Sequence, residues 1–596
     1  MSTSVSSPSA DDAASGQTPS EHAVPAKSAT PALRKDFRFW AILVAMGFAG
    51  LLTALEATIT STALPTIIAD LQGGDLFIWA ANGYFLGMTA LQPLFGQLAN
   101  VFGRRWPTIL STAGFLLGSG ICGGATNMAT LIAGRTIQGV GAGGINVLIE
   151  IVICDLIPLR ERGTYFALLF GMVAIGTALG PFFGGLIVDH ASWRWVFYLN
   201  LPIGGVALVI LLFHLRVNYN RELTLATRIT SIDWTGTFIF VGAIAAILIP
   251  LSWAGVMYSW SSYQILVPLL IGLAGLVGFM FFEASRFAPQ PTVPLRLFSN
   301  RTSASVFVLT FLHSVVTMWV LYFLPVYFQG VLGSSPSYAG VQLLPTILML
   351  IPSAILGGGL MSKIGRYLPI HYAGYALMII GFGLLTLLNK NSGTGKWVGF
   401  QMIESFGSGL IIPTLLPAVM APLAESDAAV AAATWAFLRS FGLTWGTAIP
   451  GAIFNNRFDQ LARNIEDPMV RAAVSGGRAY EHATAKFVET LSSTTRSQFE
   501  WALNESLRRT WQVGIGFAML GFLFVFFEKE VPMRKELDTE FGIENREKDT
   551  KDPEEGEVPS SQEERKYAGE EERNNAGVEE KRNTEEETKT KAATES

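Results

Sequence analysis

Four charged residues stand inside long apolar stretches of the sequence, and these positions have the greatest potential for chemistry. They are Glu56, Arg135, Glu404 and Arg439. A charged side chain in the middle of a membrane helix costs about 2.5–3.5 kcal/mol on insertion scales, so each of the four is expected to have a function. Burial favours the neutral form of a carboxyl group, and a nearby cation favours its ionised form. Carboxyl and guanidinium groups placed together could therefore bind and release a proton.

Other kinds of chemistry find little support in the composition. The chain has two cysteines, Cys122 and Cys154, which excludes a disulfide scaffold and a cysteine-rich metal site. Among only six histidines there is no metal-ligand cluster, and no glycine loop with a lysine could hold ATP. We therefore expect no enzyme, no cofactor, no metal and no nucleic-acid partner, and an ion gradient as the driving force.

The elements that must carry these charges are membrane-spanning helices. Of the 596 residues 50% are hydrophobic and only 15% are charged, which is typical of a polytopic membrane protein. A bilayer core of about 30 Å requires about 20 apolar residues per helix. The sequence predicts an all-α protein with fourteen such spans, at 40–62, 78–99, 106–126, 128–150, 165–188, 196–214, 233–254, 265–283, 303–328, 338–360, 370–388, 397–420, 430–452 and 511–528.

The distribution of charge predicts the topology. An even number of spans places both termini on one side, and the excess of Lys and Arg in alternate loops indicates that this side is the cytosol. We expect disordered cytosolic tails at 1–38 and 529–596, and the chain from Glu528 onward carries a net charge of −10. The long outer loop 455–509 contains one glycosylation sequon, at Asn504.

Two internal echoes divide the spans into repeats. Gly96 and Gly103, after span 2, have the same separation as Gly358 and Gly365, after span 10. A second glycine pair in span 4 has a counterpart in span 12, namely Gly139 and Gly141 with Gly407 and Gly409. Both echoes relate span n to span n + 8. They predict six-helix repeats at 39–215 and 301–528, with two inserted helices at 216–300, an arrangement typical of alternating-access transporters.

Five motifs then resemble those of the major facilitator superfamily, and within it the fourteen-span drug:proton antiporters. The loop from Gly96 to Arg105 is similar to the family's loop 2–3 motif, with Asn100 in place of the usual aspartate. Span 4 carries a motif around Arg135, Gln138 and Gly139, span 1 a signature in which Glu56 replaces an aspartate, and Trp193 to Gly204 an outer loop signature. The most diagnostic motif is the antiporter motif of span 5, formed by Gly176, Gly180, Pro181, Gly184 and Gly185.

The resemblance implies roles for these motifs. The span 5 glycines are expected to form a close helix contact, bendable at Pro181, that seals one face of the cavity against protons; packing alone is the alternative. The inner loop with Gly96, Asn100, Gly103, Arg104 and Arg105 is expected to latch the cytosolic side. Because Asn100 lacks a charge, that latch should be weaker or depend on hydrogen bonds, and topology alone could explain Arg105.

Depth along the helices predicts how the four charged residues meet. With a rise of about 1.5 Å per residue, Arg135 and Glu404 are each expected about 10 Å below the outer face, lining a central cavity. Arg439 is expected deeper and within reach of Glu404. We interpret Glu56 as the proton site, Glu404 as the second candidate and Arg135 as the residue that tunes them. A static Glu404–Arg439 pair is the alternative.

The expected function is export of amphipathic organic compounds, such as drugs, toxins or secondary metabolites, in exchange for protons. The aromatic and nearly uncharged residues Tyr84, Gln138, Trp319 and Trp435 are candidates for the substrate cavity. We expect a monomer in the plasma membrane, or alternatively the vacuolar membrane. A siderophore or basic amino-acid transporter and a membrane sensor without transport activity are the competing hypotheses.

Overall fold

The computed structural model describes residues 36–71, 77–216, 225–254, 257–288 and 290–534 as a helical protein. The first repeat contains α1 (Phe37–Leu71), α2 (Phe77–Ala90), α3 (Gln92–Phe102), α4 (Arg105–Gly123), α5 (Met128–Leu156), α6 (Leu159–His190), α7 (Trp195–Tyr198) and α8 (Asn200–His214). The inserted segment contains α9 (Leu225–Thr230), α10 (Trp234–Trp253), α11 (Tyr263–Glu283) and the short η2 (Leu295–Phe298).

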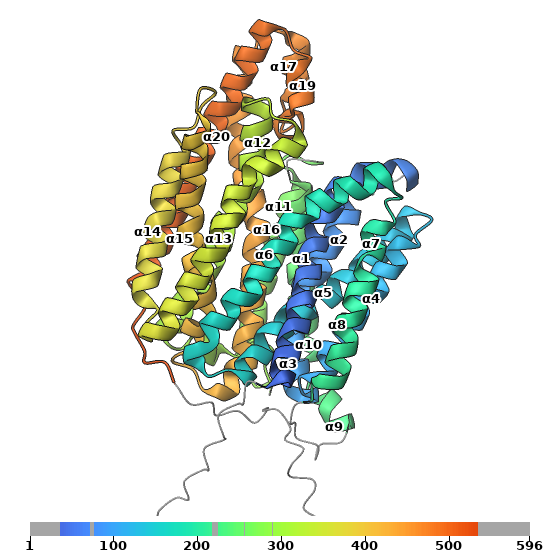
Figure 1. Cartoon of the computed structure of the whole chain (residues 1–596), viewed down its shortest axis with the longest axis vertical. Helices are drawn as coiled ribbons and strands as arrows, with labels where there is room; N and C mark the ends of the chain where they lie inside the picture. Colours follow the sequence, from blue (N-terminus) through green and yellow to red (C-terminus); the bar gives the residue numbers. More distant parts are fainter. Residues whose placement is uncertain (1–35, 72–76, 217–224, 255–256, 289, 535–596) are drawn as a thin grey trace, which may run out of the picture. The chain divides into compact units, whose positions relative to one another are not determined.

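The second repeat follows the same plan and ends in a longer pair of helices. It contains α12 (Arg301–Val326), η3 (Tyr327–Val331), α13 (Pro336–Ile364), α14 (Leu368–Leu385), α15 (Thr394–Met420), η4 (Glu425–Asp427), α16 (Ala428–Leu461), η5 (Ala462–Asn464), α17 (Pro468–Val474), α18 (Ala479–His482), α19 (Ala485–Glu489) and α20 (Ser493–Val525). We call the end of the bundle where α1 begins and α20 ends the tail end, and the opposite end, where α17 and α19 lie, the far end (Figure 1).

Each of the fourteen predicted spans coincides with a helix or a pair of helices. In the described part of the chain, ten helical segments are long and apolar enough to cross a membrane. The other four predicted spans correspond to α2 with α3, α4, α16 and α20. The span predicted at 78–99 is divided at Leu91, just before a proline at the start of α3. The predicted all-α membrane fold is confirmed.

Polar caps explain several helix boundaries. Asn127, in the short turn between spans 3 and 4, accepts a hydrogen bond from the Thr130 amide at 2.9 Å and starts α5. Ser492 caps α20 in the same way. Helix α20 therefore begins 18 residues before the predicted span at 511, and most of segment 455–509 is helical rather than an irregular loop.

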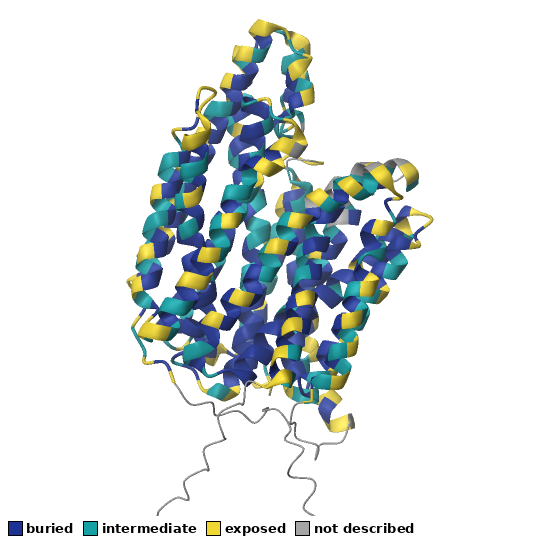
Figure 2. Cartoon of the chain, in the orientation of Figure 1, coloured by how far each residue is buried: buried dark blue, intermediate teal, exposed yellow. Residues whose placement is uncertain are grey.

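The outer faces of the helices are apolar and exposed. On α11, Leu270 and Phe281 are 62% and 74% exposed, and Leu348 on α13 is equally accessible. Figure 2 shows such exposed positions along the outward faces of α8, α13 and α14, while buried positions line the helix contacts. Exposed apolar surface of this extent marks contact with another apolar phase, and helices of this length and hydropathy identify it as lipid.

The two repeats contact each other through equivalent helices. Helix α6 packs on α13, and α3 packs on α16. The first contact joins spans 5 and 10, and the second joins spans 2 and 13. Under the n + 8 relation span 5 corresponds to span 13 and span 2 to span 10, so the two contacts are counterparts of each other. The inserted helix α10 contacts both α2 and α16 and thereby bridges the repeats on one side.

Candidate functional site

Glu56 and Arg135 form an ion pair in the interior of the first repeat. Arg135 Nη1 on α5 lies 2.6 Å from Glu56 Oε1 on α1, and the two side chains are 1% and 0% exposed. Arg135 also donates through Nε to the carbonyl oxygen of Ala80 at 3.0 Å, and its guanidinium group lies 4.4 Å from the centre of the Tyr84 ring. Arg135, which was expected to tune the proton affinity of the carboxyl groups, thus lies in direct contact with Glu56. The expectation that Arg135 lines a cavity is wrong, because its side chain is 1% exposed and contacts α1, α2 and α7.

Polar side chains complete this cluster. Asn200 on α8 donates to Glu56 Oε2 at 2.5 Å, and Thr60 donates to Glu56 Oε1 at 3.0 Å. Gln138 accepts from Arg135 at 2.8 Å and donates to Ser119 at 2.7 Å. Both carboxylate oxygens therefore have partners. A network of this kind stabilises a charged carboxylate away from water. When one member gains or loses a proton, the hydrogen bonds of the other members change with it.

The second intramembrane ion pair joins the repeats, and its acidic member was missed by the sequence reasoning. Arg439 Nη2 on α16 lies 2.9 Å from Glu150 Oε1 on α5. The expected pair of Arg439 with Glu404 is wrong. Glu150 was placed at the end of a span predicted to stop at 150, whereas α5 continues to Leu156 and carries Glu150 inside the bundle.

Glu404 lies on the other side of α15, against α14. A Cβ added to Gly381 on α14 would lie 2.5 Å from the Glu404 Cβ, so the two backbones approach closely there. Glu404 Oε2 accepts a long hydrogen bond of 3.3 Å from Ser405, and Oε1 has no partner among the described residues. Glu404 is 2% exposed and buried within the second repeat, so the expectation that it lines a central cavity is also wrong.

The span 5 glycines bring α6 close to α1. A Cβ at Gly176 would collide with the carbonyl group of Leu51, and one at Gly180 would lie 2.8 Å from the Thr58 Cβ. Gly184 is buried, whereas a Cβ at Gly185 would meet nothing within 4 Å. Helix α6 continues through Pro181, whose side chain lies outside the described residues. Close helix packing is thus established for Gly176 and Gly180.

The inner loop motif forms a corner that Arg104 holds together. Gly103 ends α3 with a φ of 76° and a ψ of 173°, which disfavours any residue with a Cβ. Gly365 ends α13 with a similar φ of 75° but a ψ of 22°, in the left-handed region. Arg104 Nε lies 2.6 Å from Asp155 Oδ2 at the end of α5, and Arg104 Nη1 donates to Asn100 Oδ1 at 3.2 Å. The charge that Asn100 cannot supply therefore comes from Asp155.

The other two members of this motif have separate contacts. Arg105 donates to the carbonyl oxygen of Leu212 at 3.0 Å, near the end of α8. Gly96 contacts the second repeat: a Cβ there would lie 2.5 Å from the Ala433 Cβ on α16. Of the five motif residues, Gly96 is the one for which the structure gives a contact across the two repeats.

A latch at the tail end connects the repeats, and it too was missed. Arg162 at the start of α6 forms an ion pair with Glu425, which precedes α16, and the side chains are 0% and 15% exposed. Arg160 donates to the carbonyl oxygens of Ser362 and Lys363 at the end of α13. The sequence signal was a basic pair after span 4 facing acidic residues after span 12. In the sequence alone, the excess of basic residues in inner loops is sufficient to explain Arg160 and Arg162 as determinants of topology.

The segment after α20 extends this latch. Arg534 Nη2 lies 3.1 Å from Glu425 Oε2, and the Arg534 carbonyl oxygen accepts from the Arg160 amide at 3.2 Å. Burial raises the pKa of the Glu530 carboxyl group above its ordinary value, although that group accepts a hydrogen bond from the Tyr367 amide. The end of the described chain therefore contacts both repeats at the tail end.

The expected cavity residues are buried. Tyr84, Gln138, Trp319 and Trp435 are all 0% exposed. Trp319 packs against Phe382 and Phe517 within the second repeat, and only Trp435 lies between the repeats, where it contacts Phe170. Elsewhere, a small open hollow lies between α2, α10 and α16 and is lined by Trp79, Asn82, Phe85, Leu86, Leu248, Ile249, Ser252 and Thr444.

Two further sites bear on the sequence predictions. Asn504 lies within α20, and its sequon partner Ser506 is fully buried and donates to the Ala502 carbonyl oxygen, so the folded chain does not present this sequon. No cluster of three or more His, Cys, Asp or Glu side chains suited to a metal ion occurs among the residues that the structure describes.

Comparison with known proteins agrees with the architecture. The family model described as "Major Facilitator Superfamily" matches this chain at residues 46–231 and again at residues 223–447. The chain is 60% identical to the MFS-type transporter pydD of an Acremonium species over 86% of this chain and 90% of that protein. It is 46% identical to the MFS efflux transporter aclA of Aspergillus oryzae, over 86% of this chain and 92% of that one.

Solved structures show the same fold at low sequence identity. The human organic anion transporter MFSD10 matches 82% of this chain and 99% of its own, with a TM-score of 0.53 and 14% identity. At this identity the likeness concerns the fold alone. The family match, the relatives and the paired repeats agree: the chain belongs to the major facilitator superfamily of membrane transporters.

Proposed function

We propose that this transporter exports amphipathic organic compounds, such as secondary metabolites or toxins, in exchange for protons. The direction is supported by relatives named as efflux pumps, including FUS6 of Gibberella fujikuroi, which is 43% identical over 86% of this chain. A further relative, 45% identical, is named as the MFS-type transporter of the acurin A biosynthesis cluster of Aspergillus aculeatus. These names motivate the substrate class.

The observation that supports proton coupling is the burial of Glu56 with Arg135 and Asn200. Protonation of Glu56 would remove one charge from the pair and one acceptor from the network. Glu56 is two residues from Thr58, which packs on Gly180 of α6. A proton that binds Glu56 therefore changes the charge beside the α1–α6 contact. A shift of α1 on proton binding would alter the helix packing of the first repeat.

We also propose that the tail end faces the cytosol of a cell whose plasma membrane holds the protein, with the vacuolar membrane as the alternative. Basic residues gather at the tail end, among them Arg104, Arg160 and Arg162, as the positive-inside rule requires. Contact between the repeats through Gly96 and Arg162 would then close the cytosolic side. Alternating access requires these contacts to open when substrate enters.

A transport experiment tests the proposal. Three pyrene probes share one apolar body and carry a sulfonate, a trimethylammonium or an alcohol group. Proteoliposomes with an acidic lumen should accumulate at least one probe through the protein molecules whose tail end faces outward. Glu56→Gln keeps the size of the side chain and removes its titration, so accumulation should fall to the level of protein-free liposomes. Glu505→Gln, at a partly exposed position of α20 away from the Glu56 network, is the matched control.

The outcomes separate the hypotheses. Gradient-driven accumulation that persists in Glu56→Gln would exclude Glu56 as the proton site. Binding of a probe without gradient-driven movement in the wild type would contradict proton-driven export and favour a sensor. Transport of basic amino acids or siderophores in place of all three probes would favour the competing substrate classes.

A further inference from the structure

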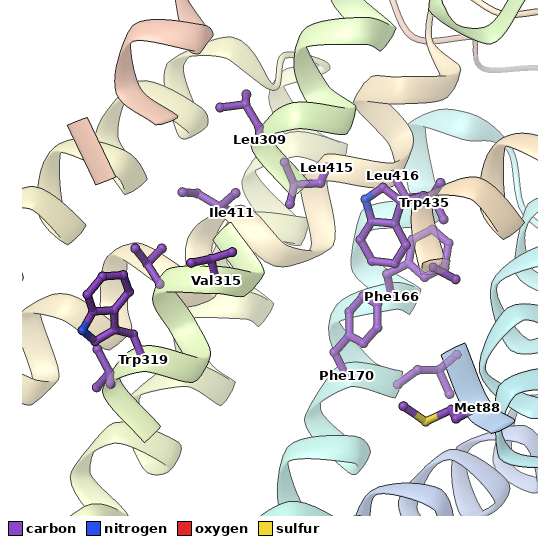
Figure 3. Packing of buried hydrophobic residues seen from close by; sticks show 14 of the residues in the cluster. Met88, Phe166, Phe170, Leu309, Val315, Trp319, Ile411, Leu415, Leu416 and Trp435 are labelled. Atoms are coloured by element: carbon purple, nitrogen blue, oxygen red, sulfur yellow. The ribbon is translucent and has the colours of Figure 1, made fainter. Parts of the chain in front are cut away.

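The Glu150–Arg439 pair differs from the Glu56–Arg135 pair in its location. Glu150 belongs to α5 of the first repeat and Arg439 to α16 of the second, so the pair lies where the two repeats meet. The Arg439 guanidinium carbon lies 5.2 Å from the centre of the Phe170 ring on α6 and 5.0 Å from the Trp435 ring. Figure 3 shows Trp435 beside Phe166 and Phe170, and the centres of the Phe170 and Trp435 rings are 6.0 Å apart. The two rings hold the guanidinium group between the repeats.

The pair also differs in how far its polar atoms are satisfied. Both carboxylate oxygens of Glu56 have hydrogen-bond donors. At the second pair, three buried atoms have no partner within the part of the chain that the structure describes: Glu150 Oε2, Arg439 Nε and Trp435 Nε1. Each buried polar group that lacks a hydrogen-bond partner destabilises the folded chain. Three of them beside one ion pair indicate a site whose remaining partner comes from outside the chain.

The charge that this site presents is positive. The Arg439 side chain is 18% exposed, whereas that of Glu150 is 2% exposed. An incoming molecule therefore meets the guanidinium group before the carboxylate. Guanidinium binds carboxylate and other oxyanions through two parallel hydrogen bonds, and Arg439 uses only Nη2 for Glu150. A basic head group would have to displace Arg439 in order to reach Glu150.

We propose that Arg439, held by Phe170 and Trp435 and paired with Glu150, binds the acidic head group of an amphipathic organic anion that the protein transports. The head group accepts hydrogen bonds from guanidinium N–H groups that Glu150 does not use and competes with Glu150 for Nη2. Glu150 thus sets the affinity by occupying Arg439 when no substrate is bound. This assignment rests on the proposed export function, and it selects anionic substrates among amphipathic compounds.

Equilibrium binding tests the assignment without any pH gradient. The full-length protein in nanodiscs is titrated with the three pyrene probes, with energy transfer from tryptophan to pyrene as the readout. The sulfonate should bind at least tenfold more tightly than the trimethylammonium probe. Arg439→Gln should weaken sulfonate binding at least tenfold and leave the alcohol within about twofold. Arg508→Gln, an exposed arginine on α20, is the matched control and should change nothing.

Glu150→Gln supplies a test with the opposite sign. It removes the internal competitor for the guanidinium group, so sulfonate should bind several-fold more tightly. Arg439→Lys keeps the charge and should retain part of the preference if Arg439→Gln proves too unstable to measure. Equal or better binding of the trimethylammonium probe, sulfonate binding unaffected by Arg439→Gln, or no binding of any probe would overturn the assignment.

The binding and transport experiments fail independently. If sulfonate binding depends on Arg439 but no probe moves under a pH gradient, the proposed export function is wrong and the anion site stands. If the trimethylammonium probe is exported and binds without Arg439, export stands and the anion site is wrong.

Discussion

The contact of Gly96 with Ala433 offers a direct test of how the tail end closes. Gly96 lies on α3 of the first repeat and Ala433 on α16 of the second. A Cβ added at Gly96 would lie 2.5 Å from the Ala433 Cβ. Gly96→Ala therefore introduces a clash between the repeats rather than within one of them. It should favour the conformation in which the tail end is open.

The size of the effect follows from this distance. Carbon atoms in contact prefer about 3.5–4.0 Å, so the helices must separate by about 1 Å or the tail end must open. Overpacking of this kind costs about 1–3 kcal/mol. Since each 1.4 kcal/mol is a factor of ten, the population with an open tail end should rise about 5-fold to 150-fold while it remains the minority state.

A native cysteine reports the change. Cys154 on α5 is fully buried, and its sulfur lies 3.5 Å from the sulfur of Met420 on α15, across the two repeats. In a Cys122→Ser background, a membrane-permeant maleimide should label Cys154 only when the repeats separate at the tail end. The labelling rate in Gly96→Ala should rise by the same factor as the open population.

Matched variants control for general destabilisation. Ala433→Gly removes the atom that the new methyl group meets, so the double variant Gly96→Ala/Ala433→Gly should return the labelling rate close to that of Ala433→Gly alone. Gly185→Ala, where the added Cβ meets nothing within 4 Å, should have no effect. Unchanged labelling in a folded Gly96→Ala protein, or no recovery in the double variant, would refute the reasoning.

Three further predictions concern the tail end. Arg162→Gln should also speed Cys154 labelling, because it leaves Glu425 without its buried partner; an effect no larger than that of Arg508→Gln would contradict a latch. Gly103→Ala should lower the thermal midpoint of the purified protein, because a φ of 76° with a ψ of 173° costs an L-residue about 1–3 kcal/mol, and an unchanged midpoint would argue against strain at this corner. Asn100→Asp should change this midpoint little, since Asp155 already supplies the negative charge; a large increase would show that the corner lacks an anion.

The spans were predictable because they follow from local composition. Apolar length places fourteen helices. The glycines reveal the repeat because Gly103 and Gly365 end α3 and α13 with a positive φ, whereas Gly96 and Gly358 lie within these helices at contacts with the other repeat. The second echo was misaligned. Gly141 packs on α4 and Gly143 on α2, while Gly407 packs on α14 and Gly409 on α13. The equivalent pairs are therefore 141 with 407 and 143 with 409.

The ion pairs were only half predictable because depth does not fix the direction of a side chain. Arg439 and Glu404 were paired by their height along neighbouring spans. The rotation of α15 about its axis instead directs Glu404 away from Arg439. Glu404 lies one turn before Gly407, and both residues face α14. Arg439 projects from α16 toward the first repeat. Glycines that mark the helix contact would have signalled the face of Glu404, whereas no local pattern indicates that Arg439 contacts α5.

The spacing of the charged pairs along the chain has a consequence for biogenesis. Glu56, Arg135 and Asn200 all belong to the first repeat, so their network can form as soon as α8 has left the ribosome. Glu150 precedes Arg439 by 289 residues. At a synthesis rate of about 5–20 residues per second, Glu150 waits roughly 15–60 seconds in the membrane before its partner exists. During that interval its carboxyl group depends on lipid, water or a chaperone, and insertion of α16 completes the joining of the repeats.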